Sequence, residues 1–166
     1  MGMYKIWVWV GLLFFTNQGF AKSVLGGLES IELRAEAVAG GKVAFPLEAR
    51  IDTGATETSL DAIDAKKFDR AGEPYVRFRT YVGGTAYDLQ APFVKQSNVR
   101  SSNGMTQRRY FVKLEICLGS QRESTVVSLA DRHSMRQPVL VGRGLLKGRY
   151  VVDVDSDHVV GEPHCN

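Results

Sequence analysis

From residue 22 onward, apolar and polar residues alternate along most of the chain, with the period of two expected of half-buried β-strands. The alternating runs come in pairs joined by glycine-containing turns, and each pair predicts a hairpin. The predicted pairs are 29–38 with 42–51, 74–82 with 85–94, and 107–118 with 123–130. Pro46 lacks an amide hydrogen, which predicts an edge position for its strand. The pattern indicates one mainly β domain.

Shorter segments complete the pattern toward the C-terminus. Residues 139–141 and 150–154 are apolar enough for two short strands, and 145–147 between them suit a short helical turn. Residues 61–70 are polar and compatible with a short helix. We expect residues 157–166 to form a flexible C-terminal tail.

The predicted strand 42–51 runs directly into Asp52-Thr53-Gly54-Ala55. Gly54 allows the backbone to approach a neighbour or a substrate, and the Thr53 hydroxyl can hydrogen-bond back into the turn. Asp, Thr and Gly are also ordinary turn residues, so this short motif alone leaves a simple strand-ending turn open.

A second motif lies far downstream, where the apolar run 138–141 leads into Gly142-Arg143 and a short helical turn. Together the two motifs resemble those of the retropepsins, the single-domain aspartic proteases of retroviruses. The resemblance implies an all-β fold, a retropepsin-like closed β-barrel (the acid protease fold) with one short helix. It also implies that the two halves of the barrel meet beneath Asp52.

Four longer segments are similar to a bacterial branch of that superfamily, the retropepsin-like family labelled ATP-dependent zinc proteases, some of whose members accompany ATP-grasp ligases. These segments are 49–55, 58–62, 129–143 and 148–153, and the likeness extends over residues 28–156. The resemblance implies three kinds of site residue. They are catalytic Asp52, Thr53 and Gly54, substrate-binding Ala55, Ser101, Ser102 and Gly104, and structural Gly142 and Arg143.

Retropepsins close a glycine-tipped hairpin over the substrate as a flap, and this chain has two candidates, 81–85 and 99–109. The family position favours the second. Viral members also carry an aspartate directly after Asp-Thr-Gly-Ala, where this chain has Thr56. We therefore expect Arg143 to pair with Glu57 or Asp61 and to brace the fold rather than contact substrate.

The zinc and ATP in the family label have no counterpart among the motifs of this chain. It contains neither His-Glu-x-x-His nor a glycine-rich nucleotide loop. The histidines are scattered at 133, 158 and 164. The last two, with Asp155 and Asp157, can bind a metal only weakly, and a solvated tail is the simpler interpretation. We expect neither a metal nor a cofactor.

Residues 1–21 have a different pattern, with a basic start through Lys5, an apolar run at 6–15 and Gly19-Phe20-Ala21 before the predicted domain. This is typical of a secretory signal peptide cleaved after Ala21. The apolar run is too short to span a bilayer. We expect a periplasmic protein with a peptidase domain at 22–156 and no stable membrane anchor after cleavage.

The charge and the two cysteines limit which partners and which covalent links the chain can have. The net charge of +3 gives no case for nucleic-acid binding. The basic residues Arg100, Arg108, Arg109 and Lys113 suit a solvated hairpin face that can steer an acidic partner. In an oxidising compartment Cys117 and Cys165 can form a disulfide within one chain or between two chains, and a buried free Cys117 is the alternative.

The chain carries one Asp-Thr-Gly motif, so a catalytic pair of aspartates requires Asp52 from each of two chains in a homodimer. Two adjacent carboxylates share one proton, and the pair can activate water. The sequence predicts an exported aspartic endopeptidase acting on peptides or proteins. Two alternatives stay open: a non-catalytic periplasmic peptide- or protein-binding module on the same fold, and a zinc metallopeptidase.

Overall fold

The computed structural model describes residues 22–100 and 104–165, which form a strand-rich domain with one short helix, α1 (Arg143–Leu146). The strands are β1 (Ser23–Leu25), β2 (Leu28–Ala37), β3 (Lys42–Ile51), β4 (Thr58–Asp61), β5 (Ile63–Arg70), β6 (Glu73–Val82), β7 (Thr85–Arg100), β8 (Thr106–Leu118), β9 (Gln121–Ala130), β10 (Val139–Val141) and β11 (Tyr150–Val152).

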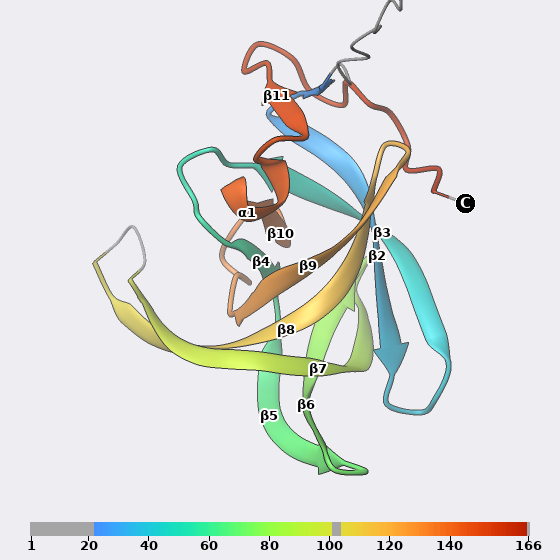
Figure 1. Cartoon of the computed structure of the whole chain (residues 1–166), viewed down its shortest axis with the longest axis vertical. Coiled ribbons are helices and arrows are strands. Elements are labelled where there is room, and N and C mark those ends of the chain that lie inside the picture. The colour runs from blue at the N-terminus through green and yellow to red at the C-terminus, as the bar shows by residue number, and fades with distance from the viewer. Residues whose placement is uncertain (1–21, 101–103, 166) are drawn as a thin grey trace, which may run out of the picture.

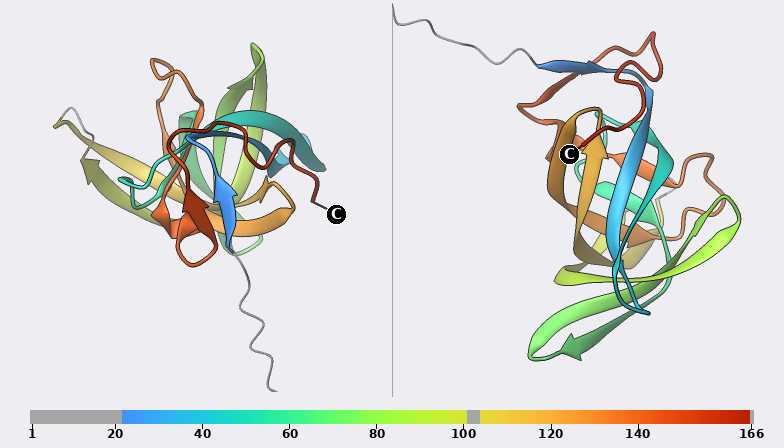
Figure 2. Two further views of the ribbon diagram at one scale, coloured as in Figure 1. Left: turned by 90° about the horizontal axis from the view of Figure 1, so that it is seen from above. Right: turned by 90° about the vertical axis from the view of Figure 1, so that its right-hand side faces the viewer.

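The main sheet closes on itself as a barrel (Figure 1). Its strands are hydrogen-bonded in the order β2-β3-β10-β4-β9-β8-β7-β6-β5, and β2 also pairs with β8 and β7. These extra pairings join β2, at one end of the sheet, to β8 and β7 and so close the barrel, while β6 and β5 continue the sheet beyond it. A separate parallel pair, β1 and β11, lies at one end of the molecule (Figure 2). The expected all-β retropepsin-like barrel with one short helix is therefore confirmed.

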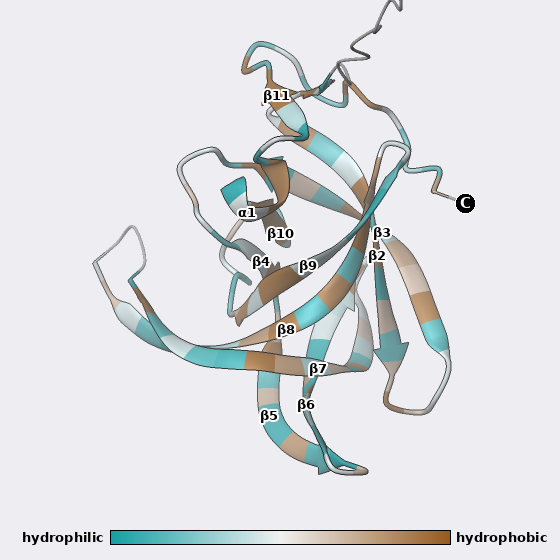
Figure 3. Ribbon diagram, viewed as in Figure 1, coloured by the Kyte–Doolittle hydropathy of each residue, from teal (hydrophilic) through white to brown (hydrophobic). Residues whose placement is uncertain are grey.

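Alternating side chains build the core. Along β3 every second residue from Phe45 to Ile51 is buried and the intervening residues are exposed, which is the pattern of a strand with one face on the core. The short strands β4 and β10 carry buried residues such as Leu60, Val139 and Val141. Figure 3 shows these apolar bands on the inner strands. The buried strand ends position the loop that follows β3.

The three predicted hairpins are confirmed as β2–β3, β6–β7 and β8–β9. Pro46 pairs with Glu32 on one side, while β10 joins β3 only at residues 49–51, so Pro46 does lie on an unpaired stretch. The helix considered for 61–70 is wrong: β5 (Ile63–Arg70) pairs antiparallel with β6 across a register shift. Strand pairing there overrides the local preference of a polar segment.

The expected flexible tail is also wrong for residues 157–165, which lie against the barrel. The amide of His158 donates to the carbonyl of Leu28 at 2.7 Å. Glu29, fully buried on β2, accepts a hydrogen bond from the amide of Val159 at 3.1 Å. The tail is fixed because its backbone satisfies a carboxylate that would otherwise be buried without enough partners.

Cys117 and Cys165 form a disulfide within the chain, with their Cα atoms 5.9 Å apart. This settles the alternatives that the sequence left open. The bond ties the end of the tail to β8, and the carbonyl of Cys165 also accepts hydrogen bonds from Arg34 at 3.3 Å and Arg122 at 3.1 Å.

The predicted signal peptide, residues 1–21, lies outside the described residues. Within residues 22–100 and 104–165, no helix is both long enough and apolar enough to cross a membrane.

Candidate active site

Asp52 sits where β3 leaves the barrel wall, between two backbone contacts that fix its position. The amide of Ile51 donates to the carbonyl of Gly27, and the amide of Asp52 donates to the carbonyl of Val141, both at 2.9 Å. The parallel register of β10 with β3 brings Val141 beside Ile51. The two sequence motifs therefore meet at this residue, as the resemblance to retropepsins implies.

The Asp52 carboxylate is held by its own turn. Its Oδ1 accepts hydrogen bonds from the amides of Gly54 at 2.8 Å and Ala55 at 3.1 Å. The side chain is half-buried, and its Oδ2 has no hydrogen-bond partner among the described residues. One oxygen thus fixes the orientation while the other is left for a reacting group. Thr53 and Gly54 are exposed beside it.

Arg143 braces this turn from the start of α1. Its Nη1 donates to the carbonyls of Thr53 at 2.6 Å and Gly54 at 2.9 Å, and its Nη2 donates to Thr56 Oγ1 at 3.2 Å. Its own amide donates to the carbonyl of Ala55 at 2.9 Å. All four contacts join Arg143 to the turn that carries Asp52.

The expected ion pair of Arg143 with Glu57 or Asp61 is wrong. Glu57 instead pairs with Lys95 at 3.3 Å, and Asp61 Oδ1 accepts the backbone amide of Arg132 at 2.6 Å. The reason is geometric, since the carbonyls of the turn converge on the guanidinium and use its donors. Sequence can identify the residue types but not which way the peptide units of a turn face.

Gly142 allows the second motif to pack directly on the first. A Cβ at Gly142 would lie 2.6 Å from both the carbonyl carbon and the carbonyl oxygen of Glu57. The amide of Gly142 also donates to the buried hydroxyl of Thr58 at 3.3 Å. Only a residue without a side chain permits this approach of the two backbones.

Positive charge gathers near the turn. Burial lowers the pKa of the Arg132 guanidinium; the carboxylates of Asp61 and Asp52 oppose that shift, while Arg109 and Arg50 reinforce it. Each of these four side chains is therefore within electrostatic range of Arg132. The Nε of Arg132 is buried without a partner in the described part of the chain. An anionic group bound at Arg132 would meet a guanidinium whose charged neighbours are two further arginines and two carboxylates.

Sequence reasoning did not assign Arg132 or Arg50 to the site, and it treated Arg109 as part of a solvated hairpin face. Arg109 is half-buried, and burial lowers its pKa. Arg132 does fall within the long segment 129–143 that resembles the bacterial family. That position is the sequence feature that could have assigned it to the site.

The hairpin of β7 and β8 projects from the barrel as an arm, residues 94–100 and 104–110 (Figure 1). The Lys95–Glu57 ion pair places the base of this arm beside the Asp52 turn. Gly104 is exposed near the tip with φ +83°, whereas Ser101 and Ser102 lie outside the described residues. The other candidate, the turn within 81–85, joins β6 to β7.

A zinc site of the kind implied by the family label needs several close nitrogen, sulfur or carboxylate ligands. Among residues 22–100 and 104–165, no three His, Cys, Asp or Glu side chains are grouped to hold a metal ion. Both cysteines are joined in the disulfide. His158 and His164 belong to the docked tail, where His164 Nδ1 lies 3.1 Å from the carbonyl of Glu162. The described donor set does not fit zinc.

Comparison with known proteins identifies the family of this chain. A family model described as the retropepsin-like aspartic endopeptidase RimB matches residues 34–163. A probable alpha-L-glutamate ligase of Shewanella pealeana is 30% identical over 120 residues, and one of Parasynechococcus marenigrum is 28% identical over 120 residues. Both alignments cover 70% of this chain and 26% of the relative, so the chain spans about a quarter of these relatives' length.

Among solved structures, a Legionella pneumophila protein of unknown function matches with a TM-score of 0.65 and 24% identity. The match covers 84% of this chain and 99% of that one. This structural match supports the barrel fold described above.

Proposed function

The chain belongs to the RimB-like family of retropepsin-like aspartic endopeptidases, and from that membership we propose that it is an exported aspartic endopeptidase acting as a homodimer. The observation that carries the proposal is the Asp52 turn. One carboxylate oxygen is anchored by two amides, the other has no partner among the described residues, and Arg143 braces the turn from below. A carboxylate that is oriented but not neutralised by an ion pair is suited to general base catalysis.

The proposed mechanism places Asp52 of two chains on either side of a two-fold axis. Two carboxylates so close cannot both ionise, so one retains a proton that polarises the scissile carbonyl while the other takes a proton from water. Thr53 is exposed next to Asp52, where its hydroxyl can bind the partner's backbone across the axis and hold the pair together. An extended peptide would add strand-like backbone hydrogen bonds in the cleft.

An apolar surface near the Asp52 turn supports the dimer. Val24 on β1 and Val151 on β11 are register partners, with 44% and 51% of their surfaces exposed. The short β1–β11 sheet leads through Gly27 to Ile51, the residue before Asp52.

For the substrate we propose an acidic peptide containing glutamate. The matching relatives are named as probable glutamate ligases, and Arg132 lies within electrostatic range of Asp52, Arg50 and Arg109. A buried guanidinium nitrogen without a partner is suited to bind a carboxylate. We expect kcat/KM to favour a glutamate-rich peptide over its glutamine counterpart. Arg132→Gln should remove that preference, and an unchanged preference would exclude this role for Arg132.

Export is supported by the disulfide, because such bonds persist in oxidising compartments. N-terminal sequencing of the native protein should give a chain that begins at Lys22. Recovery of an intact Met1 terminus from the cytosol would contradict export.

The decisive experiment is cleavage of a quenched-fluorescence peptide by the wild type and by Asp52→Asn. The amide keeps the shape of the turn but cannot share a proton, so cleavage should be abolished while the circular dichroism spectrum is unchanged. Asp155→Asn, an exposed aspartate of the C-terminal segment, is the matched control and should retain full activity.

Chelators should leave the rate unchanged. Loss of activity on chelation with recovery on added zinc would favour the metallopeptidase. Peptide binding without cleavage by the wild type would favour the non-catalytic binding module.

A further inference from the structure

Glu29 on β2 is a fully buried carboxylate whose described partners are all backbone amides. Its Oε1 accepts hydrogen bonds from the amides of Gly26 at 2.6 Å and Val159 at 3.1 Å. Its Oε2 accepts a hydrogen bond from the amide of Val160 at 3.4 Å. Burying a carboxylate without a cation is costly, and an apolar side chain would avoid that cost. The carboxylate instead connects two segments that are far apart in the chain.

The two connected segments, residues 26–29 and 156–160, lie against each other along their backbones. A Cβ at Gly26 would lie 2.4 Å from the carbonyl oxygen of Ser156, so this approach requires glycine. The carboxylate of Glu29 accepts amides from both segments and so holds them together. Because no side chain separates the two backbones at this point, a change in the reach of Glu29 would shift one segment against the other.

The held segments lead to Asp52 through backbone groups alone. The amide of Gly27 donates to the carbonyl of Ser156 at 2.7 Å, and the carbonyl of Gly27 accepts the amide of Ile51 at 2.9 Å. Ile51 ends β3 and directly precedes Asp52. The hydrogen bond from Ile51 to Gly27 is therefore one of the two backbone contacts that fix the strand end carrying the candidate catalytic carboxylate.

We propose that Glu29 is a positioning residue for Asp52. It acts through the hydrogen bond from Ile51 to Gly27, whose place depends on how the two segments are held. The side chain is fully buried, so it touches no substrate. Its effect on the cleavage rate rests on the proposed peptidase function, whereas its hold on Ile51 does not. The hydrogen bonds rather than the charge produce the effect, because the amides of both segments need an acceptor at a set distance.

Two substitutions at Glu29 separate the hydrogen bonds from the charge. Glu29→Gln loses the charge but keeps an oxygen that can accept the amides of Gly26 and Val159. Glu29→Asp keeps the charge but is shorter by one methylene group, so it cannot reach both amides. Hydrogen exchange of the Ile51 amide reports the contact, and the buried residue Val127 on β9 is the reference for global unfolding. The ratio of the Ile51 rate to the Val127 rate should rise by about tenfold or more in Glu29→Asp and stay within about threefold in Glu29→Gln.

Cleavage of the quenched-fluorescence peptide gives the catalytic readout. Glu29→Asp should lower kcat by about tenfold or more with KM within about twofold, because a misplaced carboxylate slows the reaction without changing peptide binding. Glu29→Gln should keep kcat within about threefold of the wild type.

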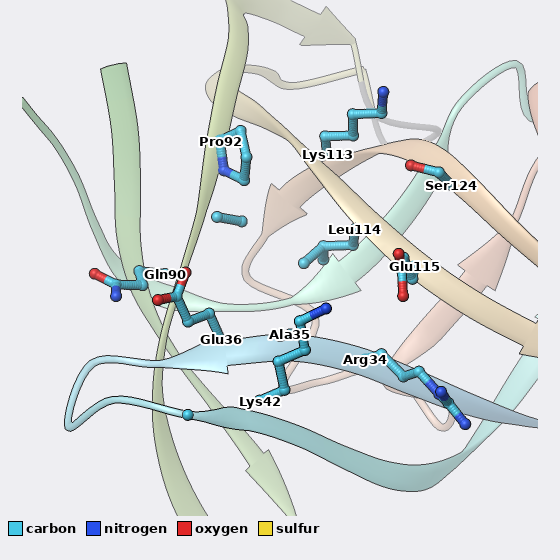
Figure 4. A pocket seen from close by; sticks show the side chains of 12 residues that line it. Arg34, Ala35, Glu36, Lys42, Gln90, Pro92, Lys113, Leu114, Glu115 and Ser124 are labelled. Atoms are coloured by element: carbon cyan, nitrogen blue, oxygen red, sulfur yellow. The ribbon is translucent and has the colours of Figure 1, made fainter. Parts of the chain in front are cut away.

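Leu114→Ala is the matched control for a loss of stability. Leu114 lines a hollow of about 430 Å³ together with Lys42, which begins β3 at the end opposite Asp52 (Figure 4). Removing this buried leucine destabilises the whole fold. Both exchange rates should therefore rise together in Leu114→Ala, with kcat unchanged. An equal loss of kcat in this control would assign the effect to stability and overturn the proposal.

The remaining outcomes are decided by the exchange ratio and kcat together. An unchanged ratio in Glu29→Asp would overturn the hold of Glu29 on Ile51, and equal rises in both Glu29 variants would refute the role of the hydrogen bonds. A raised ratio with unchanged kcat would contradict the positioning of Asp52. If the wild type cleaves no peptide, the proposed function fails, and the exchange ratio still decides whether Glu29 holds Ile51.

Discussion

At the scale of single residues, the Asp52 turn depends on one cation that forms no ion pair with any described residue. Arg143 directs its donors to two backbone carbonyls and a hydroxyl. Hydrogen bonds from a charged donor are individually stronger than neutral ones, but this guanidinium is exposed and water competes for the same oxygens. Its main effect should therefore be on the geometry of the turn rather than on global stability.

We expect Arg143→Ala to lower the free energy of unfolding by about 1–2 kcal/mol. Cleavage should fall by about tenfold or more, because a loosened turn misplaces the carboxylate. Arg143→Lys should behave similarly, since a single ammonium group cannot reach three acceptors in this arrangement. Arg136→Ala, an exposed arginine of the loop before β10, is the control. Full activity in Arg143→Ala, measured beside urea denaturation, would contradict the bracing role.

Tyr150 gives a prediction about pH. The residue is 7% exposed, and its hydroxyl is buried without a partner among the described residues. Burial raises the pKa of Tyr150 from 10.0 to about 12, with Glu123 adding to the shift and Arg149 opposing it. The unfolded chain therefore ionises first as the pH rises. The stability contributed by the neutral hydroxyl is complete below pH 10 and is lost between pH 10 and about 12.

Tyr150→Phe removes this pH-dependent contribution of the hydroxyl to the free energy of unfolding. The difference in unfolding free energy between wild type and Tyr150→Phe should shift toward the variant by roughly 2 kcal/mol from pH 8 to pH 11.5. At pH 8 the variant should be no less stable, because the lost hydroxyl has no partner. Tyr81→Phe, an exposed tyrosine, should show no such shift. A difference for Tyr150→Phe that does not change with pH would refute the prediction.

At the scale of elements, the docked C-terminal segment links several parts of the fold. Its backbone supplies donors to buried Glu29, and its disulfide fixes its end to β8. The carbonyl of Ser156 accepts the amide of Gly27 at 2.7 Å, and Gly27 in turn accepts the amide of Ile51. The segment therefore supports the strand end that carries Asp52.

Removing the disulfide should destabilise the chain substantially. The bond closes a loop between residues 48 positions apart, for which the chain-entropy model gives about 4 kcal/mol. We expect the pair Cys117→Ala/Cys165→Ala to lower the free energy of unfolding by about 2–4 kcal/mol. Urea denaturation of oxidised and reduced wild type provides the independent comparison. Equal stability of the oxidised, reduced and double-alanine proteins would show that hydrogen bonds alone hold the segment.

The elements that sequence predicts well are those with a strong local signal. Alternation and glycine turns correctly identify three hairpins. The helix at 61–70 and the flexible tail fail because both segments are polar and locally ambiguous. Their conformations are decided by partners distant in sequence, β6 for one and Glu29 with Cys117 for the other. Likewise the meeting of Asp52 with Gly142 and Arg143 was predictable, while the neighbouring arginines depend on how β3, β8 and the loop after β9 converge.

At the scale of the whole molecule, one chain supplies one Asp-Thr-Gly turn, so the proposed peptidase is incomplete alone. Activity per chain should therefore rise with protein concentration and reach a plateau as dimers form. Analytical ultracentrifugation over the same range should give a matching dimer fraction. Constant specific activity from a proven monomer would rule out the shared pair of aspartates.

Mixing wild-type and variant chains tests the shared pair of aspartates without a measurement of how tightly the dimer forms. When wild type and Asp52→Asn exchange at equal amounts, about half of all dimers carry only one carboxylate. Because a single carboxylate cannot both hold the proton and activate water, the mixture should retain about half of the activity expected from the wild-type chains alone. Asp155→Asn chains mixed in the same way should cause no loss. If the Asp52→Asn mixture instead keeps all of the wild-type activity, each chain works by itself, and the homodimeric mechanism must be abandoned.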